Sequence, residues 1–220
     1  MRKGREPSVR GSRSRDALRN AATALLDQRD ASNISITDVV RAANVTRPTF
    51  YQAFDGLSDI FTAAALSRLQ TAFERINLDE VYPADDLRGA MGDAFTIVVR
   101  ALAEHERFYL RVLEGPGGSA VVAAVTDAVS TRLKMASPVA VLLEGGVMPA
   151  DSARSALAAG AVSLIIDWLG TPADRRPSIE TIATLARDFV YGSVIGGLAA
   201  TSAPSELAAT SGTGAGRSPS

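Results

Sequence analysis

The sequence contains no cysteine, and this absence removes several classes of protein at once. Disulfide scaffolds, cysteine-ligated zinc sites and thiol catalysts all need that side chain. Histidine occurs once, at His105, between Glu104 and Glu106. Neighbouring residues on a helix point in different directions, so we interpret this Glu-His-Glu run as solvated surface and not as a metal site. We therefore expect no metal, no cofactor and no enzymatic activity.

Net charge is also nearly absent. The 23 Lys and Arg residues and the 24 Asp and Glu residues leave a formal net charge of -1 over 220 residues. Taken for the whole chain, this balance argues against nucleic acid, which usually selects basic proteins. Apolar residues make up 46% of the sequence, which excludes a wholly disordered protein because there is enough apolar surface to bury.

Long apolar runs are missing as well. The two longest, 156–166 and 189–200, are each interrupted by serine or glycine. Both are shorter than the roughly 18 to 20 apolar residues that cross a bilayer. Residues 1–20 are basic and contain no apolar stretch that could form the core of a signal peptide. We therefore expect a cytoplasmic protein without a membrane partner.

Helical periodicity is what the sequence has in abundance. Apolar residues recur at spacings of three and four along 16–27, and similar patterns follow through most of the chain. Alternation typical of strands is nearly absent. We predict an all-α fold of about nine helices, over 16–27, 36–43, 47–54, 58–76, 87–103, 106–113, 119–144 with a kink at Pro138, 152–169 and 179–199.

The first three predicted helices are short and tightly connected, which indicates a helix-turn-helix whose last helix can enter the DNA major groove. Asn44 lies in the turn, where its side chain tolerates left-handed backbone geometry. Ser35 and Thr46 precede the second and third helices as candidate N-caps. The segment 46–52 offers hydroxyl, guanidinium, phenol and amide groups that suit phosphates and base edges. Three ordinary helices of a bundle are the alternative.

Residues 36–54, ITDVVRAANVTRPTFYQAF, resemble the DNA-binding signature of TetR/AcrR transcriptional regulators. The specific part of the resemblance is confined to the N-terminal side; beyond it, only the number and layout of helices agree. The resemblance implies three DNA-binding helices followed by a larger helical domain. The implied function is that of a ligand-responsive repressor, which binds a palindromic operator as a homodimer.

Position by position, the resemblance implies a set of DNA contacts, with Tyr51 on phosphate and Phe50 pointing inward: Ser35, Thr37, Thr46, Arg47, Pro48, Thr49, Tyr51 and Gln52. Asn44 replaces the usual glycine of the turn. Leu57 stands where many members carry a phosphate-binding lysine, and the basic residues 2–15 are candidates to replace that contact. A ligand-binding module with weakened DNA binding is the alternative that Leu57 favours. An all-helical enzyme is a weaker one, because the chain lacks cysteine and has one histidine.

We expect four regions: a disordered basic tail (1–14), a DNA-binding domain (15–57), a ligand-binding and dimerising domain (58–200) and a second disordered tail (201–220). Residues 1–55 carry ten Lys/Arg and six Asp/Glu, a net charge of +4, and the remainder carries thirteen and eighteen, a net charge of -5. The near-neutral total charge therefore results from a basic N-terminal part and an acidic remainder, whose charges nearly cancel. This distribution is expected when only the N-terminal part faces phosphate.

The larger domain should enclose a pocket for an apolar or aromatic effector. Its candidate lining residues, for which an ordinary core role is the alternative, are Phe61, Met91, Phe95, Phe108, Tyr109, Val112 and Met135. The last two long helices are rich in small and apolar residues, and the resemblance implies that they pair with their copies in a homodimer. Candidate interface residues, with burial inside one monomer as the alternative, are Ala156, Gly160, Leu164, Trp168, Val190 and Val194.

Overall fold

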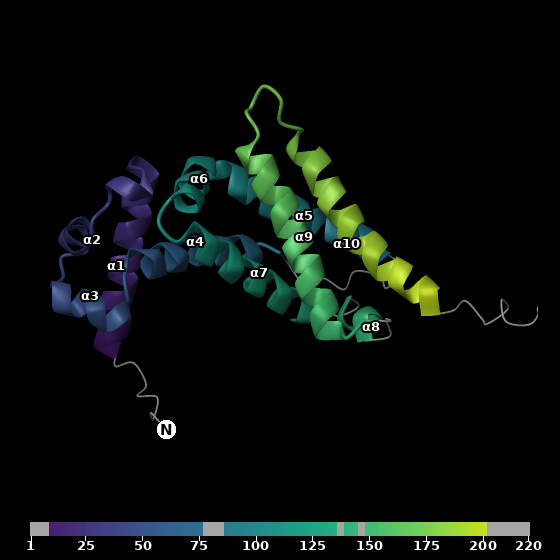
Figure 1. The fold of residues 1–220 in the computed structure, drawn as a ribbon, viewed down its shortest axis with the longest axis horizontal. Coiled ribbons are helices and arrows are strands. Elements are labelled where there is room, and N and C mark those ends of the chain that lie inside the picture. The colour runs from purple at the N-terminus through teal and green to yellow at the C-terminus, as the bar shows by residue number, and fades with distance from the viewer. Residues whose placement is uncertain (1–8, 77–85, 136–138, 145–147, 202–220) are drawn as a thin grey trace, which may run out of the picture.

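The computed structural model describes residues 9–76, 86–135, 139–144 and 148–201 (Figure 1). This part of the chain forms ten α-helices and one short 3-10 helix, and it contains no strand. The predicted all-α fold is confirmed. The predicted tails fall largely on residues 1–8 and 202–220, which lie outside the described residues.

The first three helices form a compact group at one end of the molecule (Figure 1). They are α1 (Val9–Gln28), α2 (Ile36–Ala42) and α3 (Arg47–Ala53), with the 3-10 helix η1 (Ala31–Asn33) between the first two. We call these residues, 9–53, the head. α1 begins at Val9, seven residues before the predicted start at Asp16. Residues 9–14 therefore belong to a helix and not to the predicted tail.

The short helices of the head have the caps that the sequence predicts. The Ser35 hydroxyl accepts a hydrogen bond from the backbone N–H of Asp38, whose carboxylate accepts one from the N–H of Ser35. Thr46 caps α3 through the N–H of Thr49. Asn44 adopts a φ of 52°, the left-handed conformation predicted for the turn. The chain therefore reverses tightly enough to place α3 directly after α2.

The remaining helices form the body, residues 57–201, and α4 (Leu57–Glu74) leads into it from the head (Figure 1). α5 (Leu87–Glu104), α6 (Glu106–Glu114) and α7 (Gly118–Met135) follow. The chain between α6 and α7 is Gly115-Pro116-Gly117, and Gly117 adopts a φ of 90° against the start of α4.

The C-terminal part of the body contains α8 (Val139–Glu144), α9 (Ala150–Gly170) and α10 (Ile179–Thr201). A single helix was predicted over 119–144 with a kink at Pro138, whereas the structure has two helices there, α7 and α8. Pro138, where the kink is predicted, lies outside the described residues. This division accounts for ten helices instead of about nine. Figure 1 shows α9 and α10 as a long pair far from the head.

The main hydrophobic core runs through both head and body. It includes Leu18 and Phe50 of the head together with Phe61, Phe108 and Trp168 of the body. A second buried cluster joins α5, α8, α9 and α10. Because the larger cluster crosses from one part to the other and α1 contacts α4 and α6, the head is packed onto the body through α1 and is not carried on a free linker.

One helix, α9, is long and apolar enough by length and composition to cross a membrane. In the structure it packs against α7 and α10, and 44% of its apolar window is buried. A core helix of a soluble protein meets the same criteria, so the finding is weak evidence for a membrane span.

Candidate nucleic-acid interface

The third helix presents two chemically different faces. The Phe50 side chain is fully buried, whereas the Tyr51 side chain beside it is 58% exposed. The Phe50 ring meets the Tyr51 ring edge-on at 5.4 Å and lies 6.0 Å from the Phe54 ring. Packing of Phe50 and Phe54 therefore fixes α3 from behind and leaves its polar side facing outward.

The residues predicted to contact DNA come together on one exposed part of the head. Thr49 is half-buried, and the other seven are exposed: Ser35, Thr37, Thr46, Arg47, Pro48, Tyr51 and Gln52. The Arg47 guanidinium donates a hydrogen bond of 2.8 Å to the Thr37 hydroxyl. This bond links α2 to the start of α3, so the two helices present their polar groups side by side.

The reciprocal hydrogen bonds between Ser35 and Asp38 at the start of α2 also affect the charge of Asp38. The Ser35 hydroxyl donates to the Asp38 carboxylate at 2.7 Å, and the Ser35 N–H donates at 3.0 Å. These hydrogen bonds lower the pKa of Asp38 below its ordinary value. Asp38 is therefore charged at neutral pH and places a negative charge at the N-terminus of α2.

Arg15 contributes to the head in a way that sequence reasoning missed. It was counted among the basic tail residues, but it lies in α1. Its guanidinium donates a hydrogen bond to the carbonyl oxygen of Ala53 and lies 4.3 Å from the centre of the Phe54 ring. Arg15 therefore holds the C-terminal end of α3 in place. In the sequence, Arg15 stands out only as a basic residue just before the first apolar face. That position does not show whether its side chain faces solvent or binds the C-terminal end of α3.

The packing of α4 explains why a leucine is found at position 57, where the resemblance implies a lysine. It is the first residue of α4, is half-buried, and packs against the main core. A leucine at this position strengthens the joint between head and body, while a lysine there would extend toward solvent. Leu57 therefore makes an apolar contact at the position where the resemblance implies a phosphate-binding lysine.

Two arginines of the body bind the end of α1. Arg68 of α4 makes a two-point pair with Asp27, with distances of 2.8 and 2.6 Å. Arg111 of α6 donates to the Asp30 carboxylate at 3.1 Å and to the carbonyl oxygen of Leu26 at 2.9 Å. Both contacts fix the orientation of the head relative to α4 and α6, since paired hydrogen bonds from a guanidinium restrict rotation.

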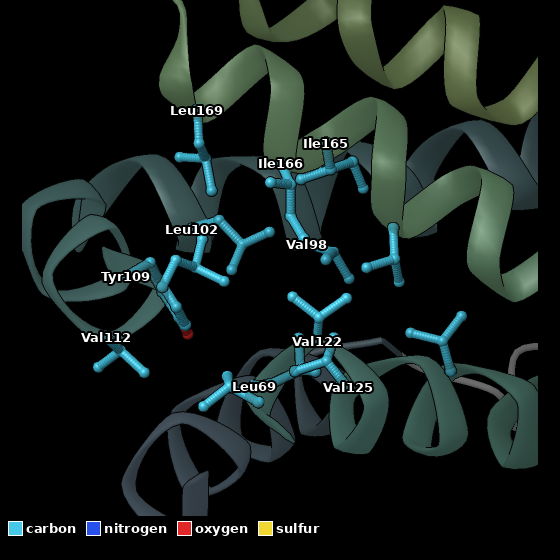
Figure 2. Close-up of a pocket in the computed structure, with 14 residues that line it drawn as sticks. Leu69, Val98, Leu102, Tyr109, Val112, Val122, Val125, Ile165, Ile166 and Leu169 are labelled. Carbon is cyan, nitrogen blue, oxygen red and sulfur yellow. The ribbon is translucent and has the colours of Figure 1, made fainter. Parts of the chain in front are cut away.

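The body contains two adjoining cavities that are partly open to solvent, and apolar side chains from five helices point into the smaller one (Figure 2). Its volume is about 70 Å³, and its lining includes Leu69, Leu102, Tyr109 and Ile165. The larger cavity, of about 150 Å³, lies between α4, α5, α7, α8 and α9. The two share Val98, Val129, Val162 and Ile165 in their walls.

Four of the seven candidate pocket residues line these cavities. Tyr109 and Val112 line the smaller one, and Met91 and Phe95 line the larger one. Phe61 and Phe108 are buried in the main core, which matches the alternative of an ordinary core role. Met135 is 66% exposed and lines neither cavity. It is the last residue of α7, and the end of a helix leaves a long side chain open to solvent.

The phenol of Tyr109 stays protonated at any ordinary pH. Burial raises its pKa to about 12, and the opposing influence of Arg68 is smaller. Within the part of the chain that the structure describes, no group of three or more histidine, aspartate or glutamate side chains is placed to hold a metal ion.

Three of the six residues predicted for the dimer interface do not lie on the outward faces of α9 and α10. Trp168, Val190 and Val194 are buried within the chain itself, and the Trp168 indole N–H donates to the carbonyl oxygen of Pro177 at 2.8 Å. These three large side chains therefore belong to the monomer core. Ala156 is exposed, and Leu164 and Gly160 are half-buried.

Further exposed apolar groups extend this outward face. Leu185 and Phe189 of α10 are 52% and 38% exposed, and a Cβ added at Gly192 or Gly196 would meet nothing within 4 Å. The space beside Gly160, in contrast, is occupied by the Phe189 ring of the same chain, because an added Cβ would lie 2.4 Å from that ring. The open part of the surface thus lies mainly on α10.

The head has the construction of a helix-turn-helix DNA-binding domain, with a buried aromatic side behind an exposed polar helix. Residues 18–64 match the family model described as bacterial regulatory proteins, tetR family. The match covers the three helices of the head and the start of α4, and solved structures described as TetR-family regulators share the fold of the longer chain.

Three solved structures with this fold illustrate the likeness. The TetR family repressor AlkX from Dietzia sp. strain DQ12-45-1b, implicated in n-alkane biodegradation, is 19% identical, with a TM-score of 0.57 over 84% of this chain and 96% of that one. A tetR-family regulator from Streptomyces coelicolor is 20% identical, with a TM-score of 0.54 over 86% and 83%. The fatty acid degradation regulator FadR from Bacillus halodurans is 13% identical, with a TM-score of 0.55 over 81% and 95%.

At these identities the likeness is one of fold. No curated protein matches the sequence.

Proposed function

We propose that this protein is a ligand-responsive repressor that binds a palindromic operator as a homodimer and is released by an apolar or aromatic small molecule. The observation that carries the DNA-binding part is the two-sided α3, with Phe50 buried and Tyr51 exposed beside Arg47. Each copy places α3 in the major groove of one half-site. DNA binding also implies a cytoplasmic location.

The residues proposed to contact DNA are the eight predicted from the sequence. Arg47 and Gln52 carry groups that hydrogen-bond base edges, and Tyr51 and the hydroxyl groups suit phosphate oxygens. The bond from Arg47 to Thr37 holds the guanidinium on the exposed face in the absence of DNA. We retain the proposed division at residue 57, with the DNA-binding domain before it and the ligand-binding and dimerising domain after it.

α6 contacts both the smaller cavity and the head, and this supports the proposal that a ligand in the cavity alters DNA binding. α6 lines the smaller cavity with Tyr109 and Val112, and Arg111 between them binds Asp30 and the end of α1. A ligand that moves α6 therefore acts directly on the head, and changes the separation of the two heads in the dimer. It weakens operator binding only to the extent that it binds the DNA-incompetent state more tightly.

A gel-shift experiment with the DNA upstream of the protein's own coding sequence tests the DNA-binding part. Arg47→Ala and Tyr51→Ala should each weaken specific binding about tenfold or more, since a good base contact is worth roughly 1–3 kcal/mol. Arg100→Ala, on the exposed side of α5 in the body, is the matched control and should bind as the wild type does. Sequence-independent binding, or normal binding by the two head variants, would contradict the proposal.

A further inference from the structure

Almost no hydrogen-bonding group faces the two cavities of the body. Among the lining residues that the structure describes, only Tyr109 and Arg132 carry a side-chain nitrogen or oxygen atom. Together the lining residues expose no polar surface in the smaller cavity and almost none in the larger one. A ligand in either cavity therefore makes apolar contacts and finds no partner for a hydrogen bond or a charge.

Arg132 lines the larger cavity with its hydrocarbon stem. Its guanidinium lies against α4, where one Nη donates to the carbonyl oxygen of Phe73 at 3.2 Å and the guanidinium carbon is 5.6 Å from the centre of the Phe73 ring. The Nε atom is buried and cannot be reached from the cavity. Arginine side chains cover apolar surface in this way, with the stem on the apolar side. The larger cavity thus selects a ligand by its shape and apolar contacts and not by its charge.

The walls of the two cavities differ in their aromatic content. Phe73, Met91 and Phe95 line the larger cavity, whereas the smaller one is lined by valine, leucine and isoleucine apart from Tyr109 (Figure 2). Aromatic rings and the methionine sulfur attract a further ring beyond the gain from buried apolar area.

The volumes of the cavities limit the size of the ligand. An apolar cavity of about 150 Å³ accommodates one benzene ring, and the larger cavity has a volume of about 150 Å³. The smaller cavity, of about 70 Å³, has less than half that volume. Size and wall chemistry therefore both favour a single ring in the larger cavity.

We propose that the larger cavity binds a one-ring aromatic hydrocarbon of the size of benzene or toluene, with no hydrogen-bonding group. The inference rests on the proposed ligand-responsive function and narrows its class of ligand. A hydroxyl or carboxylate inside the cavity would lose its water without gaining a partner. At the part of the cavity that is open to solvent, such a group would keep its water but would gain nothing from the protein.

Calorimetric titration of the full chain with toluene, phenol and benzoate tests the chemical class. Toluene and phenol have nearly the same shape and differ by a methyl group in place of a hydroxyl. Toluene should bind about tenfold or more tightly than phenol, because the wall leaves the hydroxyl unpaired, and benzoate should bind more weakly still. In a site that supplied a hydrogen-bond partner, phenol would bind at least as tightly as toluene.

Substitutions on α5 test the location. Ala94 lines the larger cavity and not the smaller one, and Ala90, one turn earlier, lines neither. Ala94→Leu should weaken toluene binding about tenfold or more because the added side chain occupies the space of the ring, and the smaller Ala94→Val should weaken it less. Ala90→Leu is the matched control and should leave the affinity unchanged. Thermal melting of each variant without ligand verifies that it is folded.

Three results would overturn the proposal: no binding of toluene, binding of phenol or benzoate as tight as that of toluene, or an unchanged affinity for toluene in folded Ala94→Leu and Ala94→Val. The titration contains no DNA, so its outcome does not depend on the operator-binding test. If toluene binds as expected but leaves operator binding unchanged, the ligand class stands and the ligand-responsive part of the proposed function fails. The two failures are therefore distinguishable.

Discussion

Single residues decide whether the head can form, and Asn44 is the clearest case. It holds the left-handed conformation between α2 and α3, with a φ of 52°. The family resemblance marks it as a departure from the usual glycine, and the residue type alone predicts that the geometry is tolerated. The exposure of Tyr51 and the burial of Phe50 follow from the same turn, because it sets the angle at which α3 leaves α2.

Replacing Asn44 with valine should destabilise the protein by about 1–2 kcal/mol, since a β-branched side chain is strained at positive φ. Asn44→Gly is the matched control and should cost less than about 0.5 kcal/mol, because glycine adopts this conformation without strain. Urea denaturation followed by circular dichroism measures both. Equal stability of the valine variant and the wild type would show that the turn relaxes around the side chain.

At the scale of elements, single arginines join helices that are far apart in the sequence. Arg176, in the loop between α9 and α10, donates to both carboxylate oxygens of Glu106 at 2.7 and 2.8 Å. It also donates to the carbonyl oxygens of Thr171 and Leu169, each at 2.8 Å. This single guanidinium fixes the α9–α10 loop onto the start of α6, the helix that also contacts the cavity and the head.

The pair of Glu106 with Arg176 should contribute a pH-dependent part of the stability. Its hydrogen bonds hold the pKa of Glu106 below the ordinary value of 4.5. A carboxyl whose pKa is lower in the folded state stabilises the protein above its unfolded pKa, and this contribution is lost as the pH falls through the folded pKa. Glu106→Gln should therefore cost about 1 kcal/mol at pH 7, a value reduced for partial exposure.

The cost of Glu106→Gln should shrink as the pH falls below 4.5, where the wild-type carboxyl itself becomes protonated. Thermal melting of both proteins at a series of pH values measures the difference. Glu104→Gln is the control: Glu104 pairs with Arg75 at 3.4 Å while both side chains are about half exposed, so its removal should cost less than about 0.5 kcal/mol. A cost for Glu106→Gln that is constant with pH would contradict the assignment.

At the scale of the whole molecule, charge and exposed apolar surface are separated. The basic N-terminal part carries a net charge of +4, while the exposed apolar residues Leu185 and Phe189 lie on α10, away from the head. This separation suits a dimer that joins through the body and presents two heads to the DNA.

Leu185→Glu should weaken dimerisation about tenfold or more, because each copy would bury an unpaired charge in the interface. Analytical ultracentrifugation over a range of concentrations measures the dimer dissociation constant, and operator affinity should fall in parallel. Gln70→Glu introduces the same charge on an exposed position of α4 and should have no such effect. An unchanged dimer in Leu185→Glu would place the interface on another surface.

Deleting residues 2–8 should reduce the salt dependence of operator binding. This segment carries Arg2, Lys3 and Arg5, and each phosphate contact contributes about 0.9 to the slope of log K against log salt concentration. Replacing these three residues with serine in the full-length chain should produce the same change, which separates charge from length. An unchanged affinity and slope would show that the segment has no role in DNA binding.

The sequence by itself determined the helical class, the caps at Ser35 and Thr46, the left-handed turn at Asn44 and the charge division. These features follow from local periodicity and from the conformational preferences of single residues. The tertiary structure decided which apolar residues turn inward. It buried Trp168 and Val190, exposed Met135, packed Leu57 into the core and placed Arg132 in a cavity wall. Helical spacing shows that a face is apolar, but only the packing of other helices determines whether that face meets the core, a cavity or solvent.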